Sequence, residues 1–446
     1  MAAGIGLGIS MGWTYIKEAL GPTINGIFSI LQGRSQFFVN ETDSKEYAQN
    51  FEDAGILSKA SILYTPTGYS AGSLNAVLPS SAPFADLTKT GGTNTTIINK
   101  DGNVEDIAAN TPRIDFENGT GEILSEQGRT NYLKDTENSD AYGSSYWSTG
   151  GSGVYYGSTR TLVNPRGVSQ TFRQYNFYGS ASIRNVIAGV TGSTAYGLAA
   201  SAWVYVTRND PGSSTTVQIG ILGHQGSPVS HTVPVGTWTR ISFRRNSGID
   251  PTGIYLYSPN ANLSVWGTQL ERSWSAGEIG LVSSYVPSTG SSSTTRSREN
   301  YVKTGIGSLI NSPQGVLYLH ASFKDLGNNQ FFAMEGPGNQ KIQIYGNTNG
   351  SVTGSIATST GKYFSMGSTS DSMSKMAIRW NGTTASVYTD GAKVGNDITM
   401  DSAFAVGAMD QIGWTNLTQP FVGRMRELAV FKEALTDAEM IALTTP

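Results

Sequence analysis

The strongest constraint on the fold lies in residues 421–431, where large apolar residues alternate with small or charged ones. An alternation with a period of two is typical of a half-buried β-strand. Thr436 and Asp437 follow this run and are residue types that favour the N-cap of a helix. We therefore predict a strand that closes a β-sandwich, then a helical turn capped by Thr436 or Asp437, with Ile441 and Leu443 packing back on the sheet.

The composition agrees with a mainly β protein built from more than one domain. The chain has 446 residues, which suggests two to four domains. It has 54 glycines and only 14% charged residues, which favours short strands and many turns over helices. It has no cysteine, so neither disulfides nor thiolate metal sites hold the fold. The net charge of -3 argues against a nucleic-acid partner.

Two β-sandwiches account for most of the chain. Aromatic-rich runs recur between residues 131 and 298 with Pro, Gly, Ser and Asn turns between them, which is the pattern of a β-sandwich. This region resembles a jelly-roll carbohydrate-binding module. A Ser/Thr-rich linker at 290–297 precedes a second sandwich over 299–446. The tryptophans within strand patterns are expected in the cores; these are Trp203, Trp238, Trp266 and Trp380.

Residues 51–130 are predicted to form a small β-rich connector. Short β-like runs are broken here by prolines and by Gly-containing turns. The clearest element is a hairpin that pairs residues 95–99 with 104–108 across the turn Lys100-Asp101-Gly102-Asn103.

Four short motifs occur in an order that resembles bacteriophage tail fibres, spikes and other virion-surface adhesins. They are Ser61-Ile62-Leu63-Tyr64-Thr65-Pro66; Ala109-Asn110-Thr111-Pro112-Arg113-Ile114-Asp115-Phe116 with Gln127-Gly128-Arg129-Thr130-Asn131-Tyr132-Leu133; Trp266-Gly267-Thr268-Gln269-Leu270-Glu271 with Ser284-Tyr285-Val286-Pro287-Ser288-Thr289; and the C-terminal strand. The C-terminal strand and helix resemble those of concanavalin A-like (laminin G-like) lectin domains. The resemblance implies host-surface glycan or receptor binding and a homotrimer.

The first fifty residues lie outside this resemblance and are predicted to contain a helical segment. Ile24, Ile27, Phe28 and Leu31 recur at the spacing of one helix face. With the fibre-like remainder, this stripe and Trp13 are candidates for an anchor that attaches the chain to other virion proteins. The alternative is a helix that packs on the core of its own chain or of a symmetry mate.

The sequence offers no convincing catalytic group. Three histidines, His224, His231 and His320, are too scattered for a triad or a metal cluster. The string Glu41-Thr42-Asp43-Ser44-Lys45-Glu46 matches the carboxylate spacing of laminarinase-type enzymes, but it lies in a polar stretch outside both sandwiches. We therefore predict no enzyme activity, with a polysaccharide depolymerase as the alternative, since distant carboxylates can converge in a fold.

Sugar binding requires exposed aromatic faces flanked by polar side chains. Trp414 and Asn416 lie in a polar loop before the closing strand, and Trp147, Tyr155 and Tyr156 lie in a Gly/Ser-rich stretch. These five residues are the ligand-binding candidates, with a Trp414 tucked under its own loop as the alternative.

No cofactor is predicted. Structural calcium is compatible with the acidic residues near the sandwich rim, but Asp390, Asp397, Asp401 and Asp410 form no motif, so the metal stays unassigned.

The combined interpretation is a virion-surface fibre or spike of tail or capsid, assembled in the host cytoplasm, which binds host-surface polysaccharide or a receptor. The start of the sequence lacks the basic region of a secretory signal, and no apolar run is long enough for a conventional transmembrane helix. The alternatives are a structural capsid, tail or baseplate decoration protein without receptor binding, the depolymerase, and a bacterial adhesin.

Overall fold

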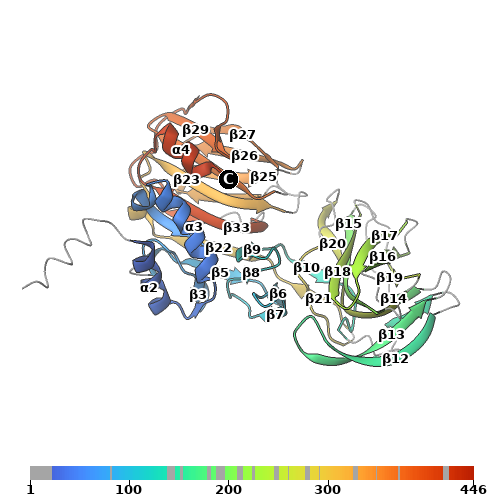
Figure 1. The fold of residues 1–446 in the computed structure, drawn as a ribbon. Helices are drawn as coiled ribbons and strands as arrows, with labels where there is room; N and C mark the ends of the chain where they lie inside the picture. Colours follow the sequence, from blue (N-terminus) through green and yellow to red (C-terminus); the bar gives the residue numbers. More distant parts are fainter. Residues whose placement is uncertain are drawn as a thin grey trace, which may run out of the picture.

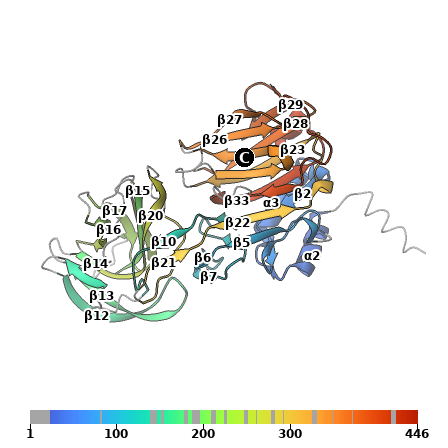
Figure 2. The same ribbon diagram turned by 180° about the vertical axis from the view of Figure 1, so that it is seen from behind.

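The protein is mainly β, with several antiparallel sheets that form sandwiches and with helices near the N-terminus (Figure 1). The computed structural model describes residues 23–446 except 81–82, 138–145, 151–153, 178–181, 187–195, 208–213, 224–226, 246–250, 260, 277–281, 291, 325–329, 348, 370–371 and 415–420. Two bodies lie side by side in both ribbon views (Figures 1 and 2). We call residues 23–131 with 294–446 the core sandwich and residues 132–293 the inserted sandwich.

The core sandwich consists of two large sheets. The ten-stranded sheet has the order β1 (Phe37–Phe38), β3 (Gly68–Ser70), β4 (Ser73–Leu74), β5 (Leu87–Gly91), β22 (Glu299–Thr304), β32 (Gln411–Gly413), β24 (Gln330–Glu335), β25 (Lys341–Gly346), β26 (Ser351–Ala357) and β27 (Gly361–Thr369). The nine-stranded sheet contains β30 (Ala392–Lys393), β29 (Thr384–Thr389), β28 (Ser374–Asn381), β23 (Gln314–Phe323), β33 (Gly423–Phe431), β9 (Glu122–Ser125) and β8 (Ile114–Asp115), with β2 (Ala60–Tyr64) on β33 and β31 (Ile398–Thr399) on β29.

The closing strand β33 confirms the C-terminal prediction. It pairs with β23 along one edge, and on its other edge with β9 at its start and with β2 at its end. Helix α4 (Asp437–Thr444) follows, with Thr436 as N-cap in a capping box with Glu439. Leu443 is buried as predicted, whereas Ile441 is exposed and Met440 takes the inward position instead.

The predicted boundary between a connector and a C-terminal domain is wrong. Strands β2 to β5, β8 and β9 come from residues 51–130, yet they extend the two sheets of the C-terminal region. Their apolar side chains belong to the core between those sheets, for example Ile62, Leu74 and Ile123. The predicted hairpin, in contrast, is confirmed as β6 (Thr95–Ile98) paired with β7 (Val104–Ile107).

The N-terminal helices pack on the outer face of the nine-stranded sheet. In α2 (Ile24–Arg34) the side chains of Ile24, Ile27, Phe28 and Leu31 are all buried. They share a cluster with side chains of α3 (Glu41–Asp53), α4 and the sheet. The alternative interpretation of the stripe is therefore the correct one: these four residues pack on their own chain, and the stripe presents no free face to a virion partner. Trp13 lies outside the described residues.

The inserted sandwich stacks two five-stranded sheets. One has the order β11 (Trp147–Gly150), β14 (Ser182–Val186), β19 (Gly253–Tyr257), β16 (Ser214–Leu222) and β17 (Val229–Pro234). The other has the order β12 (Val154–Val163), β13 (Ser169–Phe177), β20 (Asn262–Ala276), β15 (Tyr196–Thr207) and β18 (Trp238–Arg245). The tryptophans Trp203, Trp266 and Trp380 are buried as predicted, while Trp238 is half-buried.

A short antiparallel ladder carries the chain into and out of the inserted sandwich. Strand β10 (Arg129–Asn131) enters and β21 (Thr294–Arg296) returns beside it, with Asn131 opposite Thr294. Because entry and exit are adjacent, the sandwich is an insertion in the core sandwich (Figure 2). In the part of the chain that the structure describes, no helix is long and apolar enough to cross a membrane.

Candidate functional site

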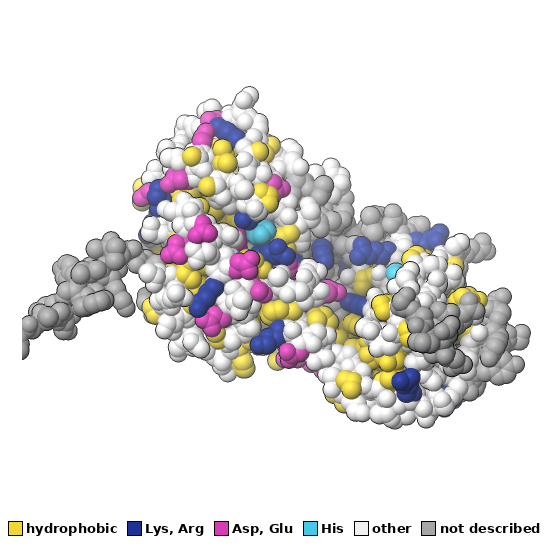
Figure 3. Space-filling model, viewed as in Figure 1, with side chains coloured by type: hydrophobic (Ala, Val, Ile, Leu, Met, Phe, Trp, Pro, Cys, Tyr) yellow, Lys and Arg dark blue, Asp and Glu magenta, His cyan; other side chains and the backbone are white. Residues whose placement is uncertain are grey.

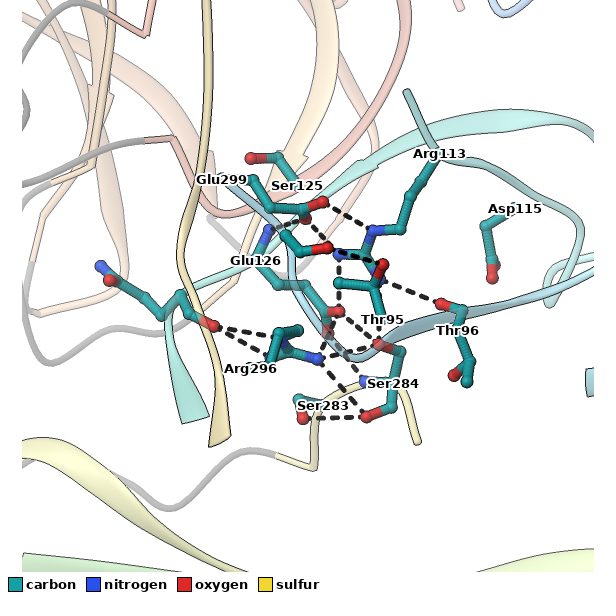
Figure 4. A network of polar contacts seen from close by, with 12 residues as sticks. Thr95, Thr96, Arg113, Asp115, Ser125, Glu126, Ser283, Ser284, Arg296 and Glu299 are labelled. Atoms are coloured by element: carbon teal, nitrogen blue, oxygen red, sulfur yellow. Dashed lines mark hydrogen bonds and ion pairs between the residues drawn. The ribbon is translucent and has the colours of Figure 1, made fainter. Parts of the chain in front are cut away.

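The junction between the two sandwiches is built around buried charges. We call Lys89, Arg113, Glu126, Ser284, Arg296 and Glu299 the junction network (Figure 4 draws its centre). Arg113 donates from Nε to Glu299 Oε1 at 2.9 Å and from Nη2 to Glu126 Oε2 at 2.8 Å. Its Nη1 donates to the carbonyl of Thr96 and to Ser284 Oγ, both at 3.0 Å. One guanidinium thus connects β6, β22, the segment that follows β9, and the inserted sandwich.

Arg296, the second arginine of the network, lies on the strand that returns from the inserted sandwich and contacts the same glutamate. Arg296 Nη1 lies 2.9 Å from Glu126 Oε2, and Nη2 donates to the carbonyl of Gln127 at 3.0 Å. Ser284 of the inserted sandwich donates its backbone N–H to Glu126 Oε1 at 2.8 Å and its hydroxyl to Oε2 at 2.5 Å. Both arginine side chains are fully buried.

The network keeps its acidic groups ionised. Burial alone would raise the pKa of Glu126, but Arg296 and Arg113 outweigh it and hold that pKa well below the usual range. The pKa of Glu299 is lowered in the same way, against burial, by Arg113 and Lys89. Burial lowers the pKa of Lys89, whose Nζ lies 2.7 Å from Glu299 Oε1. These charges are paired because unpaired charges at such depth are very costly.

A cavity of about 360 Å³ opens beside this network, between the two sandwiches. We call it the junction pocket. Its wall from the core sandwich includes the end of β9, the start of β33 and Lys324, and its wall from the inserted sandwich includes Arg240 and Arg244 of β18 and residues 282–284. Figure 3 shows Lys and Arg side chains gathering along this boundary. Clefts between domains with a few convergent polar groups are frequent ligand sites.

The inserted sandwich carries a second candidate surface on the outer face of its first sheet. Tyr255 of β19 is opposite Arg184 of β14 and opposite Gly220 of β16. A Cβ at Gly220 would lie 2.5 Å from the Tyr255 ring, and one at Gly150 would lie 2.0 Å from the Arg184 guanidinium. Both glycines therefore leave room for a neighbouring side chain to lie across the sheet. A half-exposed tyrosine beside an arginine suits stacking on a pyranose ring.

The structure does not bring the sequence-predicted ligand-binding residues together on one surface. Trp414 is fully buried among Tyr301, Phe332 and Phe421, and its Nε1 donates to Ser125 Oγ at 2.9 Å. Trp414 is therefore a core residue, as its alternative interpretation had it, and not a stacking platform. Trp414 directly follows the short strand β32, and sequence alone does not show that its indole turns inward.

The other candidates divide between the core and the part of the chain that is not described. Trp147 is buried at the start of β11 and donates from Nε1 to the carbonyl of Asp135 at 3.2 Å. Tyr155 and Tyr156 belong to β12, but their side chains lie outside the described residues, as does Asn416. The carboxylates Glu41, Asp43 and Glu46 lie on helix α3 and not on a strand, which agrees with their rejection as a glycosidase motif.

Two observations bear on the histidines and on metals. His231 Nε2 lies 2.7 Å from the carbonyl of Ser242, and His320 Nδ1 lies 3.5 Å from Glu427 Oε2. Among the described residues, no three side chains of the His, Asp or Glu type gather closely enough to hold a metal ion. His224 lies outside the described residues.

The junction network was not predicted, although three of its members lie in or beside the motifs that carried the family resemblance. Glu126 directly precedes the second part of the second motif. Arg113 comes from the second motif and Ser284 from the third. In the same region Asn131 Nδ2 donates to the carbonyls of Thr268 and Val286, and Gln269 Oε1 accepts from the Val286 N–H. The second and third motifs thus meet at one junction, and their order in the family resemblance was the available signal.

Comparison with known proteins supports a lectin-like fold for the C-terminal region. Residues 314–440 match the family model of the concanavalin A-like lectin/glucanases superfamily. The C-terminal part of the chain therefore carries a concanavalin A-like (laminin G-like) domain, which the core sandwich completes with strands from residues 60–125. No curated protein sequence matches the chain.

Similar solved structures include a trans-sialidase, a sialidase and a domain of an arabinanase. A leech intramolecular trans-sialidase complexed with 2,7-anhydro-Neu5Ac is 15% identical with a TM-score of 0.25, over 30% of this chain and 23% of that one. A Trypanosoma rangeli sialidase in complex with 2,3-difluorosialic acid is 13% identical with a TM-score of 0.27, over 32% and 26%. Domain 4 of an extracellular arabinanase from Geobacillus stearothermophilus, in complex with arabinotriose, is 10% identical with a TM-score of 0.20, over 72% and 100%.

The matched region spans about a quarter of the length of the two sialidases. Similarities at these identities and TM-scores carry no argument about the ligand or activity of this chain.

Proposed function

We propose that this chain is a virion-surface fibre or spike protein that binds host-surface glycans through its β-sandwiches and does not cleave them. The observation that carries the proposal is the match of residues 314–440 to the concanavalin A-like lectin/glucanases superfamily. The junction pocket and the Tyr255 surface supply the places where a sugar binds. Attachment to the particle falls to residues before 23, because the apolar face of α2 is used within the chain.

Binding through such sites is weak for each copy and gains strength from valency. A pyranose gains from stacking on an aromatic ring and from a few hydrogen bonds to a shallow polar surface. In a homotrimer, three copies present the same sites to one polysaccharide, so that later contacts become intramolecular. Mass photometry of the purified chain tests the assembly, since a trimer has three times the 47.4 kDa of one copy.

The chemistry of the junction favours binding over hydrolysis. A glycosidase needs one carboxylic acid that donates a proton and a second carboxylate that acts as base or nucleophile. Glu126 and Glu299 are the two carboxylates of the junction network, and both have lowered pKa values, against burial, because of arginine and lysine partners. Neither group holds a proton at neutral pH, so neither serves as the general acid.

The decisive experiment exposes the full chain to polysaccharide extracted from the host-cell surface. Biolayer interferometry measures retention, and a reducing-sugar assay on the same samples measures cleavage. We expect retention without release of reducing ends. Release of oligosaccharides would replace this proposal with a depolymerase, and a chain that is retained neither by extracts nor by intact cells would be a structural decoration protein.

A further inference from the structure

The junction pocket has an uneven charge. Its lining contains six basic side chains and two acidic ones; the basic ones are Arg129, Arg240, Arg244, Arg296, Lys324 and Arg424, and the acidic ones are Glu117 and Glu126. The chain as a whole has a net charge of -3, so this positive concentration is local and opposes the overall balance. A concave site lined by one sign of charge raises the local concentration of ligands of the other sign.

The two acidic residues of the lining already have partners. Glu126 forms ion pairs with Arg113 and Arg296 in the junction network. Glu117 Oε2 lies 2.5 Å from Arg424 Nη2, and Arg424 also contacts Asp115 at 2.6 Å. Glu117 Oε1 also lies 4.0 Å from Arg240 Nη1. The two carboxylates of the lining therefore pair with arginines, and among the described residues neither forms an ion pair with Lys324 or Arg244.

Two of the cations have no ion-pair partner among the described residues. Lys324 follows β23 in the core sandwich, and Arg244 is exposed near the end of β18 in the inserted sandwich. Burial is the main cause that lowers the pKa of Lys324; the neighbouring Arg424 lowers it further, while Glu117, Glu126 and Glu122 raise it. An anion in the pocket would meet a positive charge from each sandwich.

Buried donors inside the same lining also lack partners. The Nε atoms of Arg240 and Arg424 are buried without a hydrogen-bond acceptor. Arg240 is held in place by its stacking on Trp203 at 4.6 Å and by its hydrogen bond to the carbonyl of Ser283 at 2.8 Å. The guanidinium of Arg240 is thus held at the wall of the pocket, where its positive charge favours an anionic ligand.

From this charge distribution we infer that the junction pocket binds the carboxylate groups of an acidic polysaccharide, with Lys324 and Arg244 contacting the ligand from opposite sandwiches. The inference rests on the proposed glycan-binding function and specifies its ligand class. A pocket of about 360 Å³ lies at the lower end of the range for small-molecule sites, which suits one part of a chain whose remainder stays in solvent.

The test uses the full chain on an array of bacterial surface polysaccharides that contain glucuronate, galacturonate or sialic acid. Each acidic polysaccharide is printed beside its carboxyl-reduced form, and poly-L-glutamate is included. The variants are Lys324→Gln and Arg244→Gln, with Lys432→Gln as a control at an exposed lysine outside the pocket and Tyr255→Ala as a probe of the second surface. Unchanged thermal midpoints show that each variant is folded.

We expect binding to acidic members, loss of that binding on carboxyl reduction, and weakening with increasing salt. Lys324→Gln and Arg244→Gln should each reduce affinity about threefold to tenfold, as expected for single charged contacts at a partly exposed site, and Lys432→Gln should not.

Equal binding to the acidic and reduced forms, or affinity that neither pocket variant changes, would overturn the inference. If Tyr255→Ala then abolished binding, the proposed glycan-binding function would stand on the second surface alone. Binding to poly-L-glutamate without any polysaccharide would reassign the pocket to an acidic protein partner. A chain that bound none of the probes would refute both the acidic ligand and the glycan-binding function.

Discussion

At the residue scale, Arg113 is the side chain on which the junction depends most. It satisfies two buried glutamates, a backbone carbonyl and Ser284 at once. Removing one partner of a buried ion pair leaves an uncompensated charge. Arg113→Ala should therefore lower the free energy of unfolding by about 3–5 kcal/mol, measured by urea denaturation.

The matched control is the ion pair between Lys59 and Glu439, which is 2.5 Å long but partly exposed. Lys59→Ala should cost less than about 1 kcal/mol, because solvent screens such pairs. Similar losses of unfolding free energy in the two variants would show that burial does not make the Arg113 ion pairs more stabilising than the exposed pair.

The same network predicts an acid limit to stability. The pKa values of Glu126 and Glu299 in the folded protein lie below the ordinary value of 4.5. Their contribution is complete above the unfolded value and is lost as the pH falls through the folded values. The thermal midpoint, followed by circular dichroism from pH 7 to pH 3, should decline below about pH 4.5. Glu126→Gln should flatten this decline; an unchanged slope would mean that other groups cause it.

At the scale of elements, variants of helix α2 test whether its apolar stripe packs on the core of its own chain or faces a partner protein. Ile27 is 1% exposed against the chain's own core, whereas Ile30 is 47% exposed on the opposite side. Ile27→Ala should lower the free energy of unfolding by about 2–5 kcal/mol. Ile30→Ala should change it by less than about 0.5 kcal/mol. Chemical denaturation of both variants measures the difference, and equal effects would contradict the packing described here.

The sequence predicted those elements whose signals are local. The 95–108 hairpin, the closing strand and the Thr436 cap each follow from neighbouring residues, since turn type, alternation and capping are short-range properties. Helix α3 was missed because its run of polar residues has few apolar positions to mark a face. The junction network was missed because Arg113 and Glu299 are separated by 186 residues, and pattern gives no register over such a distance.

At the scale of the whole molecule, the adjacency of β10 and β21 makes the inserted sandwich removable. Joining Asn131 to Thr294 by an Asn-Gly turn, with 132–293 deleted, closes a short hairpin on the existing ladder. The shortened chain should remain soluble and unfold cooperatively, at a lower thermal midpoint because Ser284 and Tyr285 are lost from the junction.

Residues 299–446 alone should fail to fold, since β33 would lose both β2 and β9 from one edge. Circular dichroism and proton NMR dispersion show which of the two shortened chains is folded. Cooperative unfolding of 299–446 together with failure of the deletion chain would restore the domain boundary that the sequence suggested.

The pairing of β2 with β33 also fixes an order of events during synthesis. Tyr64 lies opposite Leu428, so strand β2 cannot complete its pairing until β33 has left the ribosome, a delay of roughly 20–70 s at ordinary elongation rates. All strands of the inserted sandwich lie between residues 147 and 276 and emerge long before that. A growing chain therefore carries a finished inserted sandwich while the sheet around it stays open, and the core closes only after β33 has been made.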